Sequence, residues 1–197
     1  MAVLNRTGRR SRHRNSRGQA LVEFSLVILP FMTLIVAIIE FSFLLTIRVG
    51  VTTTTQDAVQ LAAELGNGAS TDFQVLSLIE RDVSAPMNKA KIVSVVFFST
   101  DAYGKVNNGQ DKYTRGGVYQ NPSDKTQTVP YTQDPTLGYP PVNRCNVVAI
   151  VICGGVDYLG VTITYQYNWI TPLPGLVGLG SAPLFVQTSV SRLEPVQ

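Results

Sequence analysis

The chain has 197 residues, room for one anchored domain of ordinary size, and carries a formal net charge of +3. The basic charge is concentrated at one end, because six arginines precede Gly18 while the rest of the chain holds 10 Lys and Arg against 13 Asp and Glu. After Gly18 there is no basic patch with interleaved aromatic residues, which argues against a nucleic-acid surface.

The first 18 residues are predicted to be a basic leader without acidic residues. Its arginines are Arg6, Arg9, Arg10, Arg12, Arg14 and Arg17. The following run from Phe24 to Ile47 contains one formal charge, Glu40. At about 1.5 Å per residue the run is about 36 Å long, enough to cross a hydrocarbon core of about 30 Å with some tilt. We therefore predict a single-pass membrane helix whose leader stays in the cytoplasm, with everything after Arg48 extracytoplasmic.

Three kinds of segment begin in this way. A cleaved secretory signal has a shorter apolar core and a small-residue cleavage site, which Ile47-Arg48-Val49-Gly50 does not provide. A twin-arginine signal is suggested only by the pair Arg9-Arg10, and the residues after this pair do not resemble such a signal. A prepilin leader is cut on the cytoplasmic side, before an apolar helix that is kept, and this third arrangement fits the chain.

The stretch Gly18-Gln19-Ala20-Leu21-Val22-Glu23-Phe24 has a glycine, a glutamate five residues later and an aromatic residue directly after it. It resembles the cleavage site of type IV prepilins of the Flp/Tad kind. Together with Leu29-Pro30 and Ile39-Glu40-Phe41, residues 17–65 resemble the TadE-like minor pilins, or pseudopilins, and Ser191 to Glu194 is similar to the closing strand of that family.

The resemblance implies a structural component of a tight-adherence type IV pilus, not an enzyme. It implies cleavage between Gly18 and Gln19 by a prepilin peptidase, and assembly through Glu23, Phe24 and Glu40. The implied partners are the peptidase, the major and other minor pilins, the inner-membrane Tad assembly platform and membrane lipid. The implied location is the inner membrane or the pilus fibre.

Two acids need a physical account, Glu23 just before the apolar run and Glu40 within it. Glu23 is costly at the start of a span unless it stays near the interface or finds a cation. The resemblance implies that it pairs with the amine of Gln19 on a neighbouring subunit; the alternative is an interfacial residue near the headgroups. Glu40 is expected to face another protein segment rather than lipid. Pro30 is expected to loosen or kink the helix.

The helix is expected to run over residues 19–65 and to continue past the membrane. Beyond Arg48 a helical stripe faces the rest of the domain, formed by Val51, Thr55, Ala58, Ala62 and Leu65. Gly66-Asn67-Gly68 is expected to end the helix.

Residues 66–197, called the head below, are predicted to be an α+β, pilin-like fold. Thr71 to Gln74 is typical of a capping box that opens a short second helix, ended by Pro86. An antiparallel sheet of about four strands is expected to pack on the long helix. The expected strands are Ile92–Phe98, Val147–Ile152, Val161–Trp169 and Leu184–Leu193.

Two segments of the head are predicted to be loops. Residues 101–143 are rich in turn dipeptides and contain Tyr103, Tyr113, Tyr119, Tyr131 and Tyr139. These tyrosines either form a contact surface or anchor the loop to the sheet. The apolar, Pro- and Gly-rich residues 171–183 are expected to touch the bilayer, to contact a neighbouring subunit or only to cap the sheet edge.

The sequence offers little for catalysis or metal binding. No histidine follows His13, which removes Ser-His and Cys-His pairs and histidine metal sites, and the acids of the head are scattered and mostly expected on solvated faces. No cofactor is expected. A straight strand between Cys145 and Cys153 would separate them by about 26 Å, which argues against an internal disulfide. The alternatives to a pilin are an unprocessed, signal-anchored extracytoplasmic binding protein and, least favoured, a tethered hydrolase.

Overall fold

The computed structural model describes residues 16–136, 138–146, 155–172, 175, 178 and 180–195. The leader arginines up to Arg14, the predicted strand Val147–Ile152 and much of the predicted loop 171–183 lie outside these residues. The chain forms two compact units, Met1–Ile39 and Glu40–Gln197.

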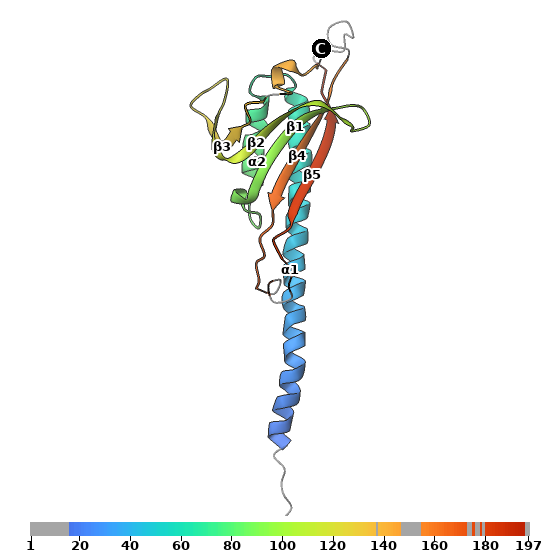
Figure 1. The fold of residues 1–197 in the computed structure, drawn as a ribbon, viewed down its shortest axis with the longest axis vertical. Helices are drawn as coiled ribbons and strands as arrows, with labels where there is room; N and C mark the ends of the chain where they lie inside the picture. The colour runs from blue at the N-terminus through green and yellow to red at the C-terminus, as the bar shows by residue number, and fades with distance from the viewer. Residues whose placement is uncertain are drawn as a thin grey trace, which may run out of the picture. The chain divides into compact units, whose positions relative to one another are not determined.

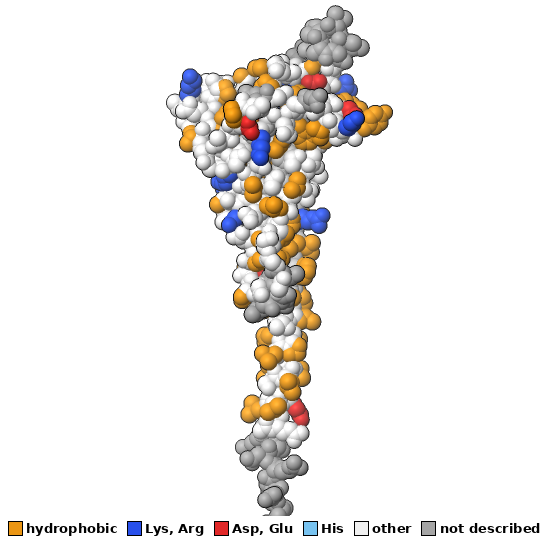
Figure 2. Space-filling view, in the orientation of Figure 1, with side chains coloured by type: hydrophobic (Ala, Val, Ile, Leu, Met, Phe, Trp, Pro, Cys, Tyr) orange, Lys and Arg blue, Asp and Glu red, His pale blue; other side chains and the backbone are white. Residues whose placement is uncertain are grey.

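Helix α1 covers Ser16–Leu65 and continues through Pro30. It begins three residues before the expected Gln19, because Arg17 and Gly18 do not stop a helix, although glycine costs about 1 kcal/mol relative to alanine there. In the first unit most of the large apolar side chains of α1 are exposed, and Figure 2 shows apolar side chains along the face of the helix that is turned to the viewer.

Within the second unit, α1 buries the predicted stripe. Val51, Thr55, Ala58 and Ala62 are buried, whereas the acids and glutamines between them are exposed. The helix ends as expected at Gly66, which has a φ of +55° and donates its N–H to the Ala62 carbonyl at 3.1 Å. The Nδ2 atom of Asn146 would lie 2.6 Å from a Cβ at this position, so a side chain has no room.

Helix α2 covers Thr71–Asp82. The helix itself was predicted, but the capping box was wrong. Ser70 is the N-cap and makes no side-chain capping bond; instead the Gln74 amide donates to the Ser70 hydroxyl at 3.0 Å. Asp72 does not cap the helix because it points into the protein, where its side chain is fully buried.

In the described part of the chain, five antiparallel strands form one sheet in the order β3-β2-β1-β4-β5 (Figure 1). They are β1 Ile92–Thr100, β2 Val106–Gln120, β3 Thr128–Gln133, β4 Tyr158–Gln166 and β5 Leu184–Arg192, with short 3₁₀ helices at Lys89–Lys91 and Pro141–Asn143. The α+β class is therefore confirmed, and the described sheet is larger than the expected four strands.

The prediction of a loop over residues 101–143 was wrong. Strands β2 and β3 lie inside it, and Tyr113 and Tyr131 are fully buried. The glycines that suggested turns mark irregularities within a long strand: Gly109, with a φ of +140°, lies beside a register shift in the β1–β2 pairing, and Gly116, with a φ of +113°, lies beside one in the β2–β3 pairing. Among the tyrosines named for this segment, Tyr113, Tyr131 and Tyr139 are part of the core, while Tyr103 is exposed.

One face of the sheet carries the core of the second unit. Val95, Phe97 and Ile163 belong to a buried cluster that also contains Ala58 of α1 and Leu76 of α2. Both helices therefore pack on the same face, as Figure 1 shows. Strand β4 shows the period-two alternation that the sequence predicted for it from Val161 onward, since Val161, Ile163 and Tyr165 are buried.

Cys145 is disulfide-bonded, and Cys153 is the only other cysteine in the sequence. The expectation against an internal bridge is therefore wrong. The argument against the bridge assumed a straight strand between the two cysteines, and the bond of Cys145 does not support that assumption.

Candidate functional site: the apolar helix and its buried carboxylate

The N-terminal part of α1 presents an apolar surface to its surroundings. Among the described residues, Gly18–Leu65 is the one helix long and apolar enough to cross a membrane, and the most apolar part of it is not buried by the rest of the protein. Soluble monomers rarely expose a contiguous apolar surface of this extent. The helix therefore fits a single-pass membrane protein.

The predicted cleavage and assembly residues lie on neighbouring turns of this helix. Gly18 is helical, and a Cβ added to it would meet no atom within 4 Å. The Gln19 side-chain amide donates to Glu23 Oε1 at 3.0 Å, the spacing of residues i and i+4. Phe24 is exposed. Position 19 and Glu23 are thus within hydrogen-bond reach of each other on an exposed helix surface.

Glu40, the first residue of the second unit, is only 4% exposed. Its carboxylate accepts three hydrogen bonds from the segment after β4: from the Tyr167 hydroxyl at 2.6 Å, the Ile170 N–H at 3.0 Å and the Thr171 N–H at 2.8 Å. Glu40 thus faces protein, as expected, but the protein segment belongs to its own chain. Its expected role in assembly stays a prediction.

The donors to Glu40 follow from the pattern of β4. The alternation that buries Ile163 and Tyr165 continues past the end of the strand to Tyr167, whose ring packs at 5.5 Å from the Trp169 ring and 5.9 Å from the Phe185 ring. Sequence reasoning placed Tyr167 on a strand but did not connect it to Glu40. The available signal was chemical, because a buried tyrosine hydroxyl needs an acceptor and an acid in an apolar run needs donors.

A second buried charge lies between α2 and the sheet. The Arg144 and Asp72 side chains are both fully buried, with Arg144 NH1 at 2.7 Å from Asp72 Oδ1. The angle between the guanidinium and the carboxylate does not suit a hydrogen bond, so the contact is an ion pair. The Arg144 guanidinium lies between the rings of Phe97, at 5.4 Å, and Tyr139, at 5.2 Å.

The prediction that the acids of the head mostly lie on solvated faces fails for this cluster. Burial raises the pKa of Asp72, while the charge of Arg144 and the hydroxyl of Tyr113, which donates to Asp72 at 2.9 Å, oppose that rise. Asp111 is also fully buried and accepts the N–H groups of Gly138 and Tyr139, both at 2.9 Å.

These carboxylates bind the protein's own backbone. Asp157 accepts the Cys145 N–H at 2.8 Å and the Tyr139 hydroxyl at 3.1 Å, and the bonds to Asp111 hold the start of the same segment. Within the described ranges, no group of three His, Cys, Asp or Glu residues is placed to hold a metal ion. The cluster acts as a structural support of residues 138–145.

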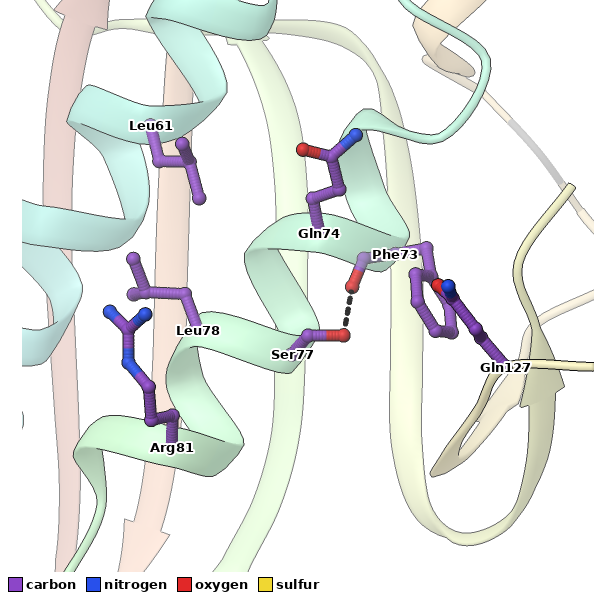
Figure 3. Close-up of a pocket in the computed structure, with 7 residues that line it drawn as sticks. All are labelled: Leu61, Phe73, Gln74, Ser77, Leu78, Arg81 and Gln127. Carbon is purple, nitrogen blue, oxygen red and sulfur yellow. Dashed lines mark hydrogen bonds between the residues drawn. The ribbon is translucent and has the colours of Figure 1, made fainter. Parts of the chain in front are cut away.

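An open groove of about 520 Å³ lies beside α1 and α2 (Figure 3). Its lining residues are Leu61, Phe73, Gln74, Ser77, Leu78, Arg81 and Gln127. Ser77 donates to the Phe73 carbonyl at 2.8 Å, and Arg81 pairs with the adjacent Asp82 at 2.9 Å. The lining offers no acid–base pair or activated nucleophile, so we assign no chemistry to this groove.

Comparison with known proteins identifies the segment that carries the apolar helix. Residues 18–60 match the family described as TadE-like protein. Searches of curated proteins and of solved structures found no match. Residues 18–60 of this chain are therefore similar to TadE-like proteins, which confirms the family resemblance predicted for this part of the sequence.

Proposed function

We propose that the protein is a minor pilin, or pseudopilin, of a tight-adherence type IV pilus, and that it acts as a structural assembly component. The observation that carries this proposal is the TadE-like match over an exposed, membrane-length apolar helix. The head supports a structural role, since its buried acids serve as acceptors for the protein's own donors.

In this proposal a prepilin peptidase cuts between Gly18 and Gln19 on the cytoplasmic side, where the leader arginines hold the N-terminus. The partners are the peptidase, the major and other minor pilins and the inner-membrane Tad assembly platform. The protein resides in the inner membrane, with its head extracytoplasmic, and enters the fibre or supports its assembly.

One observation favours the alternative, an unprocessed membrane-anchored binding protein. Helix α1 begins at Ser16, so the Gly18–Gln19 bond lies within its first turn. Cleavage then requires that turn to unwind. The first turn of a helix has unsatisfied N–H groups and frays easily, so the cost of unwinding is small.

The N-terminal residue of the protein recovered from membranes tests the proposal. The chain is expressed with and without a working Tad prepilin peptidase. We expect Gln19 as the N-terminus only when the peptidase is present. An intact leader in cells that contain the active peptidase would decide for the unprocessed anchor.

Gly18→Val separates cleavage from membrane insertion. A valine at this position meets no neighbouring atom, and the apolar run is unchanged, so insertion should be normal. A β-branched side chain in a tight peptidase site should block cleavage, and the full-length chain should accumulate. Gly18→Ala is the control, because it adds a single methyl group at the same place. Equal processing of wild type and Gly18→Val would show that Gly18 is only a joint between leader and helix.

A further inference from the structure

Helix α1 fixes the depth of Glu40 in a membrane. Gly18–Ile39 is about 33 Å long, close to the thickness of a hydrocarbon core of about 30 Å. If the inner boundary of the core lies between Gly18 and Phe24, its outer boundary lies about 20 residues later, between about residues 38 and 44. Glu40 falls within this interval, and Arg48, which is exposed, lies about 12 Å further along the helix axis.

The hydrogen bonds of Glu40 bring a segment of the head to the same depth. Tyr167, Ile170 and Thr171 all donate to the Glu40 carboxylate at 2.6–3.0 Å. Glu40 directly follows Ile39 in one continuous helix. The depth of residues 167–171 therefore follows from the length of α1 and from their hydrogen bonds to Glu40. Residues 167–171 therefore lie at the outer boundary of the hydrocarbon core if α1 spans the membrane.

The composition and exposure of this segment suit such a position. No Asp, Glu, Lys or Arg occurs between Asp157 and Arg192. Ile170 is 55% exposed, Pro172 and Leu184 are also exposed, and Trp169 is half-buried beside them. Leu184 belongs to the same end of the sheet because it pairs with Gln166. An ordinary soluble surface is about a quarter to a third charged, so an uncharged surface with exposed apolar side chains is unusual.

We infer that Asn168–Pro172 together with Leu184 forms a membrane-interface surface, which rests on the outer leaflet of the bilayer that α1 crosses. The ligand is lipid at the boundary between headgroups and acyl chains. Trp169 contributes part of a ring of the type enriched at this depth, with its indole N–H turned into the head, and Ile170 contributes exposed apolar area. Glu40 is the positioning residue, since it holds the segment against the helix at the height of the boundary. The inference rests on the proposed insertion of α1.

The chain contains one tryptophan, so its fluorescence reports on this surface alone. The full chain is reconstituted into phosphatidylcholine vesicles that carry a nitroxide quencher either near the headgroup end of the acyl chain or near its tip. We expect several-fold stronger quenching of Trp169 by the shallow nitroxide than by the deep one, and weak quenching by iodide in the water. Trp169→Phe should remove the signal.

The outcomes separate this inference from the proposed function. Failure of the chain to float with the vesicles would contradict membrane insertion itself. Flotation with strong iodide quenching and no nitroxide quenching would place Trp169 in water and overturn the inference alone. Flotation with neither kind of quenching would mean that protein, such as a second copy of the chain, covers the surface, which also overturns it.

Glu40→Gln tests the positioning role. A glutamine keeps the shape but turns one end of the group into a donor, which then faces the N–H group of either Ile170 or Thr171, because these two groups bind different oxygens of Glu40. We expect the preference for the shallow nitroxide to fall and iodide quenching to rise several-fold, while circular dichroism shows that the head stays folded. Glu64→Gln, at an exposed acid of the same helix, should show the same nitroxide and iodide quenching of Trp169 as the wild type. An unchanged profile in Glu40→Gln would refute the role of Glu40.

Discussion

Arg144 shows how a single residue organises the buried polar groups of the head. Its side chain is fully buried, between two aromatic rings and next to Asp72. It also donates from NH2 to the Tyr139 carbonyl at 3.2 Å, so it links the segment before the disulfide to α2. Removing one partner of a buried pair leaves the other charge without compensation, which costs about 3–5 kcal/mol.

Arg144→Met should therefore lower the free energy of unfolding by about 3–5 kcal/mol. Denaturant unfolding of the full chain in detergent, followed by circular dichroism, measures the change. Arg81→Met is the matched control, because the Arg81 side chain is 74% exposed and its pair with Asp82 should contribute less than about 1 kcal/mol. Similar midpoints for the two variants would contradict the importance of the buried pair.

The buried acids differ in how far the sequence alone could identify them. Glu40 was identifiable because it is the one charge in a long apolar run, and such a charge must find a partner. Asp72 and Asp111 carried no comparable signal, because their neighbours in sequence are ordinary and the partners that bury them lie far along the chain. Their burial is set by tertiary packing, which no local pattern encodes.

At the scale of elements, tyrosine hydroxyls connect α2 to the sheet. Tyr113 of β2 donates to Asp72, and Tyr131 of β3 donates to Glu80 at 2.7 Å, which also pairs with Arg115 of β2. Burial, together with the neighbouring carboxylates, raises the pKa values of Tyr113 and Tyr131 well above their usual value. The contacts require the neutral phenol, because a phenolate cannot donate to a carboxylate.

The raised pKa values predict a loss of stability at high pH. Above the pKa of about 10 that tyrosine has in an unfolded chain, the unfolded state releases protons that the folded state retains, so the free energy of unfolding falls as pH rises. We expect part of the tyrosinate absorbance to appear only together with the loss of the circular dichroism signal. Complete ionisation of all tyrosines in a folded head would contradict the arrangement.

The packing of β1 against β4 predicts a second effect at this scale. Gly160 lies opposite Phe98, and a Cβ at position 160 would come within 2.3 Å of the Phe98 ring. Gly160→Ala should therefore destabilise the head by about 1–3 kcal/mol through overpacking. Gly180→Ala, where a Cβ meets no atom within 4 Å, serves as the control in the same unfolding measurement. Equal stability of both variants would show that Phe98 moves aside without cost.

The positions of strands β1, β4 and β5 could be predicted from the sequence, whereas that of β2 could not, and the difference lies in their residues. Strands β1, β4 and β5 consist of β-branched and aromatic residues in runs or alternation, and such patterns favour strands directly. Strand β2 contains three glycines and is polar over much of its length, so local preference points to turns. Pairing with β1 on one side and β3 on the other overrides that preference.

At the scale of the whole molecule, the first prediction concerns topology. With the leader arginines in the cytoplasm, Ser11→Cys should be protected from a membrane-impermeant thiol reagent in intact cells, while Ser123→Cys, at an exposed position of the head, should react. Labelling after cell lysis shows that both thiols are reactive. Reaction of Ser11→Cys from outside the cell would reverse the orientation.

The second prediction at this scale concerns assembly. If Glu23 pairs with the new amine of Gln19 on a neighbouring subunit, Glu23→Gln should leave cleavage after Gly18 largely intact and reduce incorporation into sheared pili. Asp57→Asn, at an exposed acid of the same helix beyond the apolar run, is the control for charge removal. Normal incorporation of Glu23→Gln would exclude the charge of Glu23 from assembly.

The hydrogen bonds of Glu40 also impose an order on the biogenesis of the protein. Their donors lie 127, 130 and 131 residues further along the chain. At a synthesis rate of about 5–20 residues per second, the ribosome needs on the order of 10 s to produce them after Glu40 has emerged. If α1 is inserted into the membrane during this interval, it carries an unpartnered carboxylate near one end. Insertion of the helix would then precede the folding of its contacts to the head, because the donors to Glu40 belong to one of the last segments to be translated.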